Sequence, residues 1–375
     1  MSKVKLGDIA QEVRETTKDA SGLRSVGLEH LTPGALELTS WSDDAENTFT
    51  KVFCKGQILF GRRRAYLKKA AVAPFDGVCS GDITVIAAKS DRIMPELLPF
   101  VISDDRFFDF AMEKSAGSLS PRVKWAQLAE YQLELPPMEE QPRLTNLLWA
   151  MERTKKAYQG LLAQTDELVK SQFIEMFGDP VTNEKEWPMA KLSDVAEIRI
   201  GPFGSLLHRE DYVQGGHALI NPSHIVDGCV VPDENLTVSD QKYSELCAYK
   251  LEKDDIVLGR RGEMGRCAVV DTAGYLCGTG SMIIRSNGIL MPFFLQRMIS
   301  SPSYRRIIEE KAVGVTMMNI NVPIVSTLDI PLLPKALQEQ YLMVVEQADK
   351  SKLAIRQSLE SLEKSRNALM NQIFG

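Results

Sequence analysis

The stretch EEQPRLTNLLWAMERTKKAYQGLLAQTDELVKSQFIEMFG, residues 139–178, decides how the rest of the chain is interpreted. Its apolar residues alternate between spacings of four and three, which is the pattern of a helix that packs along a second helix. A helix from Gln141 to Phe177 is about 55 Å long at 1.5 Å per residue, close to the width of a small domain. Lys155 and Thr165 are polar positions on this predicted seam. The apolar seam residues are Leu144, Leu148, Met151, Tyr158, Leu162 and Val169.

A second stretch of the same kind runs from Gln338 to Phe374. Each of the two predicted long helices follows a globular stretch, so they frame two similar modules. The apolar stripe of the second helix consists of Tyr341, Val345, Ala348, Ile355, Leu359, Leu362, Leu369 and Ile373.

Length and composition bound the kind of protein. The 375 residues are too many for one ordinary core and fit two domains with connectors, and 44% hydrophobic content is typical of a soluble protein. No run of eighteen apolar residues or apolar leader is visible, so we expect a cytoplasmic protein that does not enter a membrane. The six cysteines include no CxxC pair, which favours buried, reduced thiols over a metal site.

An internal repeat organises the chain. Three pairs of segments match: VKLGDIAQ (4–11) with AKLSDVAE (190–197), KGQILFGRRR (55–64) with KDDIVLGRRG (253–262), and LELPPMEEQ (133–141) with LDIPLLPKALQEQ (328–340), where the second copy carries extra residues. Short β-type and helical runs mix within each copy, so the expected fold class is α+β. A domain of about 140 residues followed by a helix of about 40 is therefore used twice, which fits normal domain sizes.

A local cluster of positive charge stands out against the net charge of −6. The window from Lys51 to Ala73 holds seven basic and no acidic residues. Clustered cations bind phosphates, and arginine also binds guanine with two hydrogen bonds. A solvated loop is the alternative, but repetition at the same point of both copies favours nucleic-acid binding. The candidate DNA contacts of this kind are Arg62, Arg63, Arg64, Lys68, Lys69, Arg260, Arg261 and Arg266.

A second pair of candidate loops precedes the exit of each domain: GSLSPRVKW (117–125) and GVTMMNINV (314–322). Their polar side chains have the reach to contact phosphates or base edges, although an ordinary surface loop explains them equally well. The candidates are Ser118, Ser120, Arg122, Lys124, Thr316, Asn319 and Asn321.

Signatures of an enzyme are absent from the sequence. There is no GxxxxGK[ST] phosphate loop, GxSxG elbow or GxGxxG fingerprint. Asn221-Pro222-Ser223-His224 is not the Asn-Pro-Pro-aromatic motif of an adenine-N6 methyltransferase, and the four histidines are scattered. We therefore expect no catalytic residue, metal or cofactor in this chain.

Several segments together resemble the specificity subunit of type I restriction–modification systems, across essentially the whole chain. They are LPPMEEQ before the first helix, DELVKSQFIEMFGDP at its end, VGLEHLTPGAL, and GPFGS followed by Asp211-Tyr212. The second helix entry, Pro334 to Gln340, departs from the compact PPMEEQ form.

The resemblance implies a fold and a function. Two target-recognition domains would each read one half of a bipartite site in double-stranded DNA. The two helices would form an antiparallel coiled coil, with pseudo-twofold symmetry, that fixes the spacer and docks two methyltransferase subunits. S-adenosylmethionine would bind to those partners, and a restriction subunit with motor and nuclease activity would join the full assembly.

The expected domains are a target-recognition domain at 1–137, the central helix at 138–178, a connector and second recognition domain at 179–335, and the C-terminal helix at 336–375. A rod of about 55 Å spans about 1.5 turns of B-DNA, so two domains at its ends would reach adjacent stretches of major groove. Two alternatives stay open: the recognition subunit of a related restriction–methylation enzyme, and a coiled-coil scaffold that joins two protein-binding domains.

Overall fold

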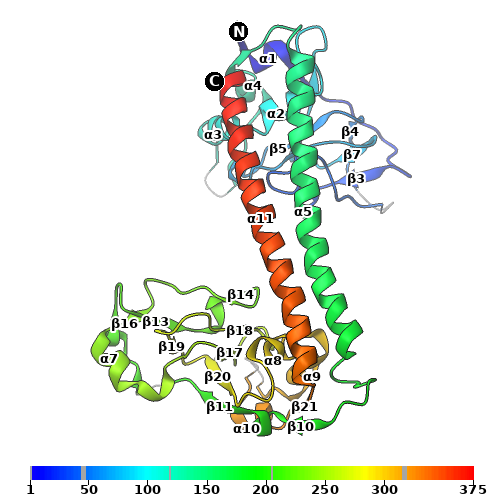
Figure 1. Cartoon of the computed structure of the whole chain (residues 1–375). Coiled ribbons are helices and arrows are strands. Elements are labelled where there is room, and N and C mark those ends of the chain that lie inside the picture. Colours follow the sequence, from blue (N-terminus) through cyan, green and yellow to red (C-terminus); the bar gives the residue numbers. More distant parts are fainter. Residues whose placement is uncertain (1, 44–47, 118–119, 204–205, 315–318) are drawn as a thin grey trace. The chain divides into compact units, whose positions relative to one another are not determined.

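The computed structural model describes residues 2–43, 48–117, 120–203, 206–314 and 319–375 (Figure 1). The chain divides into two compact units: unit 1 contains Met1–Leu161 and Ala354–Gly375, and unit 2 contains Leu162–Leu353. Both divisions fall inside long helices, so each of these helices contributes to both units. The predicted mixture of strands and helices, with long helices among them, is confirmed. The domain boundaries expected from the sequence stay predictions.

In the described part of unit 1, the strands form three small sheets. They are β1 (Ser2–Lys5), β2 (Ala10–Val13), β3 (Arg24–Val26), β4 (Lys51–Phe53), β5 (Ile58–Gly61), β6 (Ala70–Val72), β7 (Gly77–Cys79), β8 (Ile83–Ala88) and β9 (Gln132–Leu135). The central sheet is antiparallel, in the order β2-β8-β5-β6. A second sheet, β3-β7-β4, pairs β3 with β7 in parallel, and β1 pairs with β9.

Short helices cover the central sheet of unit 1. They are α1 (Leu6–Ile9), α2 (Leu98–Ile102), α3 (Asp105–Glu113) and α4 (Trp125–Leu128). α3 begins at an aspartate cap, where the Asp104 carboxylate accepts a hydrogen bond of 2.9 Å from the backbone N–H of Arg106. The main core packs Phe60 of β5 against Phe107 and Phe108 of α3.

The described residues of unit 2 form four small sheets and five short α-helices. Its strands are β10 (Met189–Lys191), β11 (Ala196–Ile200), β12 (Tyr212–Val213), β13 (His217–Ile220), β14 (Ile225–Val226), β15 (Cys229–Val230), β16 (Thr237–Val238), β17 (Ile256–Gly259), β18 (Cys267–Val269), β19 (Leu276–Cys277), β20 (Ser281–Ser286) and β21 (Asp329–Pro331). Its short helices are α6 (Leu192–Val195), α7 (Asp240–Glu245), α8 (Pro292–Ile299), α9 (Pro302–Lys311) and α10 (Val322–Ser326).

The two units repeat one arrangement of elements. The sheet β11-β20-β17-β18 has the same order and antiparallel pairing as β2-β8-β5-β6. The pair β10-β21 matches β1-β9, and the parallel pair β13-β19 matches β3-β7. α8, α9 and α10 follow the second sheet as α2, α3 and α4 follow the first. The repeat inferred from the sequence is therefore also a repeat of topology.

Two long helices, α5 (Gln141–Phe177) and α11 (Lys335–Phe374), contribute to both units. α5 covers the predicted range, and α11 begins three residues before the predicted Gln338. Leucine, alanine, glutamine, lysine and glutamate, which favour helix, dominate both segments. α5 ends at Phe177, and the next residue, Gly178, has the left-handed conformation of a glycine C-cap, with φ of 76°. The Gly178 N–H donates to the Ile174 carbonyl at 2.8 Å.

Within each unit, a part of α5 packs on a part of α11. In unit 1, Leu144 and Leu148 share a core cluster with Met370 and Phe374. In unit 2, the Tyr341 hydroxyl donates to the Val169 carbonyl at 3.2 Å. Every predicted seam residue is buried or partly buried.

A buried glutamine ties the start of each long helix to its domain. Gln141 accepts from the Met94 N–H at 2.7 Å and donates to the Pro136 carbonyl at 3.0 Å. Gln338 accepts from the Met291 N–H at 2.7 Å and donates to the Leu333 carbonyl at 2.8 Å. Each glutamine therefore bonds to the carbonyl five residues earlier. The sequence comparison aligned Gln141 with Gln340 and therefore expected extra residues before the second helix. In the structure Gln141 corresponds to Gln338, so this expectation is wrong for the helix entry.

Candidate nucleic-acid interface

The first arginines of the charged segment lie at the end of a central strand. β5 and β8 are antiparallel, with Gly61 opposite Ile83, so the residue after β5 lies beside the residue before β8. These two residues are Arg62 and Asp82, and the Arg62 N–H donates to the Asp82 carbonyl at 3.0 Å. The ladder thus places a carboxylate beside the arginines, although the stretch from Lys51 to Ala73 contains no acidic residue.

The second predicted loop of unit 1 meets the first. Arg122 forms backbone bridges with Arg63 and with Ala116, and the Val123 N–H donates to the Arg62 carbonyl at 3.0 Å. The Arg63 guanidinium also donates to the Ser120 hydroxyl. Two segments that the sequence treats separately therefore form one surface, which we call the arginine cluster: Arg62, Arg63, Ser120, Arg122 and Asp82.

Asp82 lies among three guanidinium groups. Its carboxylate accepts from Arg122 Nε at 2.8 Å, and Arg63 Nη1 and Arg62 Nε lie at 3.6 Å and 3.9 Å. The hydrogen bond from Arg122 is the main cause that holds the pKa of Asp82 below its usual range. The side chain of Asp82 is 19% exposed, whereas those of Arg62, Arg63 and Arg122 are 37%, 38% and 48% exposed. Three cations and one anion leave a positive, partly exposed surface.

The other predicted contacts of unit 1 have varied surroundings. Arg64 is exposed and adopts φ of 55°. Lys69 Nζ donates to the Leu28 carbonyl at 2.6 Å, and Lys68 pairs with Asp105. Lys124 is exposed and precedes α4. Ser118 lies outside the described residues.

Unit 2 builds a different site at the equivalent position. Arg260 follows β17 as Arg62 follows β5, but Arg260 is only 5% exposed and its Nε donates to the Ile320 carbonyl at 3.1 Å. Burial lowers the pKa of Arg260. Arg261 is exposed and forms a backbone bridge with Asn319, just as Arg63 does with Arg122.

Further candidates of unit 2 take part in local structure. Arg266 pairs with Glu263, with 3.1 Å between Nε and the carboxylate. Asn321 caps α10, because its side-chain oxygen accepts from the Ile324 N–H at 3.0 Å. Thr316 lies outside the described residues. The proposed DNA contacts of both units stay predictions.

Two histidines have equivalent structural roles in the repeat. The Gly27 N–H donates to His30 Nδ1 at 2.9 Å, and the Asn221 N–H donates to His224 Nδ1 at 3.2 Å. Each histidine closes a short 3-10 turn three residues after the donor. These contacts give His30 and His224 the same local structural role in the two copies.

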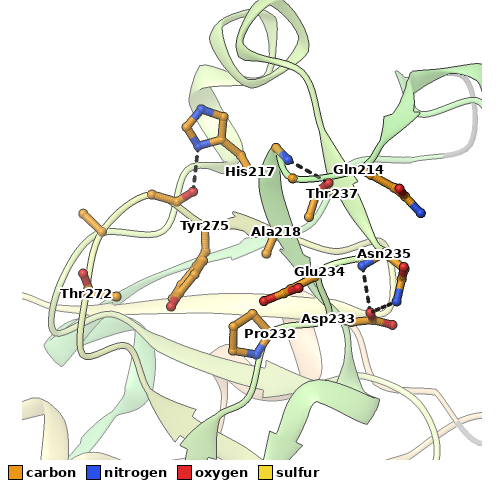
Figure 2. A pocket seen from close by; sticks show the side chains of 14 residues that line it. Gln214, His217, Ala218, Pro232, Asp233, Glu234, Asn235, Thr237, Thr272 and Tyr275 are labelled. Carbon is orange, nitrogen blue, oxygen red and sulfur yellow. Dashed lines mark hydrogen bonds between the residues drawn. The ribbon is translucent and has the colours of Figure 1, made fainter.

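A pocket of about 580 Å³ lies elsewhere in unit 2, at β13 and β16 (Figure 2). Figure 2 shows Asp233 accepting hydrogen bonds from Asn235, and His217 bonded to the Gly274 carbonyl at 3.0 Å. Asp233 and Glu234 give the lining acidic character. Carboxylates repel phosphate, so this pocket lacks the chemistry of a DNA contact.

The expectation of buried thiols is correct for three cysteines and wrong for the other three. Cys79, Cys267 and Cys277 are buried, whereas Cys54, Cys229 and Cys247 are exposed. Burial raises the pKa of the Cys79 and Cys267 thiols to about 12. No group of three or more histidine, cysteine, aspartate or glutamate side chains among the described residues is arranged to hold a metal ion. None of the described helices is both long and apolar enough to cross a membrane.

Comparison with known proteins shows a similarity to type I restriction specificity proteins. Residues 184–364 match the model of the type I restriction modification DNA specificity domain. The chain is 27% identical over 167 residues to the Type I restriction enzyme EcoDI specificity subunit of Escherichia coli. The aligned stretch covers 41% of this chain and 36% of that protein. The matched part thus spans little more than a third of that relative's length. The resemblance to a type I specificity subunit is confirmed.

Two solved structures have a similar fold. One comes from work on complex assembly and conformational transition of the type I R-M system. It has a TM-score of 0.63 at 20% identity and covers 99% of this chain and 97% of that one. The Type-I restriction-modification system S subunit from M. genitalium has a TM-score of 0.58 at 12% identity, covering 100% of this chain and 96% of that one.

Proposed function

We propose that this chain is the DNA sequence-recognition subunit of a type I restriction–modification system, in which units 1 and 2 each read one half of a bipartite site. The single observation that carries the proposal is the match of residues 184–364 to the DNA specificity domain. That match covers the second copy of the repeat. Unit 1 has the same sheet order and the same succession of helices, so we extend the recognition role to it.

The charged surfaces support a role in DNA binding. The arginine cluster of unit 1 offers several guanidinium groups on one surface, and guanidinium binds both phosphate oxygens and the O6 and N7 edge of guanine. Unit 2 has the exposed Arg261 beside Asn319 at the equivalent place. An amide pairs best with adenine, so the two half-sites are expected to differ in sequence.

The long helices are proposed to form the antiparallel coiled coil that sets the distance between half-sites. Lys155 on α5 pairs with Glu363 on α11 at 3.0 Å, and Asp166 on α5 pairs with Lys352 on α11 at 3.0 Å. Eleven residues separate the two partners on each helix, in opposite chain directions. The first ion pair lies in unit 1 and the second in unit 2, and each joins antiparallel parts of the two helices within its unit.

The same helices are proposed to dock the methyltransferase subunits. Leu147, Leu161 and Leu168 of α5 are 45%, 46% and 57% exposed, and their spacings of 14 and 7 residues place them on one helix face. Rows of exposed leucine on a helix are typical of a protein interface. S-adenosylmethionine would bind to the docked subunits, and a restriction subunit would complete the assembly. The chain itself would then need no catalytic residue.

A binding assay tests the proposal directly. The purified chain, together with the methyltransferase subunit of its own system, is titrated with a fluorescent random-sequence duplex at several salt concentrations. We expect binding that weakens linearly in a plot of log K against log salt, because bound counterions are released from DNA. A scaffold that joins protein-binding domains would instead show no salt-dependent DNA binding, and that result would exclude the proposal.

A further inference from the structure

Asp82 is an acidic residue at the centre of a surface that the proposed function requires to bind an anion. Its carboxylate contacts Arg122 at 2.8 Å and lies within 4 Å of Arg62 and Arg63. These arginines come from two segments: Arg62 and Arg63 follow β5, and Arg122 comes from the loop before α4. Asp82 is thus the group that all three guanidiniums face. The Arg63–Ser120 hydrogen bond is a further tie between the two segments.

The second copy shows the site without this carboxylate. The Arg260 N–H donates to the Gly280 carbonyl at 2.8 Å, as the Arg62 N–H does to Asp82, so Gly280 occupies the place of Asp82. There Arg260 is 5% exposed and donates to backbone carbonyls. A Cβ on Gly280 would lie 3.0 Å from Cδ of Pro222, so this position has little room for an acidic side chain. Where the carboxylate is missing, the first arginine of the repeat is buried.

We propose that Asp82 is a positioning residue that holds Arg62, Arg63 and Arg122 in one fixed arrangement, on which recognition of the first half-site depends. This inference rests on the proposed function. Free arginine side chains have many rotamers, and ordering them on binding costs affinity. A carboxylate that accepts from several guanidiniums removes part of that cost before DNA arrives, as a supporting residue does for a preformed site. The ligand that guanidinium groups of this kind recognise is a guanine edge with its flanking phosphates.

Electrostatic repulsion alone predicts a different effect of removing the Asp82 carboxylate, and this difference makes the inference testable. A carboxylate near DNA repels phosphate, so removing it should strengthen binding to every duplex equally. Positioning predicts that its removal weakens discrimination at the first half-site, while binding to random DNA is kept or strengthened. Discrimination at the second half-site, read by unit 2, should not change. A variant that no longer folds would lose binding to random DNA and discrimination at both half-sites. Misfolding can therefore be distinguished from the loss of positioning.

The experiment uses the full chain in complex with its methyltransferase subunit and compares Asp82→Asn with the wild type. Dissociation constants are measured for the cognate duplex, for duplexes with the first or the second half-site scrambled, and for a random duplex. The control is Asp91→Asn, which removes one charge from a residue that is 78% exposed and paired with Arg92, outside the arginine cluster. The expected result for Asp82→Asn is a loss of about tenfold in discrimination at the first half-site, the scale of one bidentate arginine contact. Asp91→Asn should lose none.

Two results would overturn the inference. One is that the ratio of the dissociation constants for the first-half-scrambled and the cognate duplex does not change in Asp82→Asn. The other is that Asp82→Asn binds every duplex more tightly by the same factor. If Asp82→Asn is not folded at the assay temperature, Asp82→Glu replaces it, since the charge is kept and the carboxylate is displaced. Unchanged discrimination in Asp82→Glu then contradicts the inference. A wild type that discriminates neither half-site would defeat the proposed function as well, whereas a discriminating wild type with an unaffected variant would defeat only the role of Asp82.

Discussion

Lys155 of α5 and Glu363 of α11 form an ion pair with 3.0 Å between Nζ and Oε1. Lys155 lies on the apolar seam, its side chain is 26% exposed, and its charge has a partner on the other helix. An exposed pair of this kind contributes little stability, about 0–1 kcal/mol. A polar residue on a seam can instead select one register of the two helices. A polar residue on a seam can also contact a bound partner protein, but the ion pair within the chain favours a role in register.

A shorter pair of helices should bind a site with a shorter spacer. The heptads 158–164 of α5 and 354–360 of α11 lie, along each helix, between the ion pairs Lys155–Glu363 and Asp166–Lys352. Deleting both heptads keeps the seam and removes about 10 Å at 1.5 Å per residue. At 3.4 Å per base pair, the preferred spacer should shorten by about three base pairs. Binding to a set of duplexes with graded spacers measures this.

The control for the deletion is Gly160→Ala. Gly160 has open space around the added Cβ, so the substitution strengthens the helix without shortening it. Its preferred spacer should equal that of the wild type. A double-heptad deletion that folds and keeps the original spacer would show that the helices do not set the distance.

Removing two arginines of the cluster should reduce the salt dependence of DNA binding. Arg62→Gln combined with Arg63→Gln deletes two cations that are 37% and 38% exposed. Each lost phosphate contact lowers the slope of log K against log salt by about 0.9, so the slope should become less steep by up to about 1.8. Lys364→Gln is the matched control, because Lys364 is an exposed cation on α11 paired with Glu360. Equal slopes of log K against log salt in the two variants would mean that DNA does not contact the arginine cluster.

The buried glutamine at the start of α5 should matter for stability. Gln141 is 0% exposed, and replacing it with leucine leaves the Met94 N–H and the Pro136 carbonyl without their partner. Two unsatisfied buried groups should lower the free energy of unfolding by about 2–5 kcal/mol. Chemical denaturation measures the loss. Gln164→Leu, at an exposed site of the same helix, should change it by less than about 0.5 kcal/mol. Similar values for the two variants would contradict the proposed anchoring.

The exposed leucines of α5 should be needed for binding the methyltransferase subunit. Leu161→Asp combined with Leu168→Asp puts two charges on the proposed docking face, where both side chains are about half exposed. Because neither is buried, the fold should survive while co-elution with the methyltransferase subunit on size exclusion is lost. Val226→Asp, at an exposed valine of β14, is the control. Normal co-elution of the double variant would move the docking surface away from this face.

Local patterns were readable from the sequence, whereas pairings between distant residues were not. The spacing of apolar residues from Leu144 to Val169 predicts α5, because a helix seam depends on neighbours three and four residues apart. Asp82 was missed because it lies 40 residues from Arg122 and joins the arginines only through the pairing of β5 with β8. The pairing of β5 with β8 is the signal from which the place of Asp82 beside the arginines could have been predicted.

The two Gly-Arg-Arg segments show a further limit of the sequence. Arg62 and Arg260 occupy the same place in matching segments, yet Arg62 is partly exposed and Arg260 is buried. Their difference follows the exchange of Asp82 for Gly280, residues that no local pattern connects with either arginine. The capping role of Asn321 is likewise visible only once α10 is placed after it.

The central claim is that two domains of one chain read two separate half-sites. Selection of bound sequences from a random duplex library, with the chain in complex with its methyltransferase subunit, tests it most directly. We expect two short specified segments separated by a fixed stretch without sequence preference, and Arg122→Gln should change only one of the two segments. A single continuous motif, or no enriched sequence at all, would contradict it.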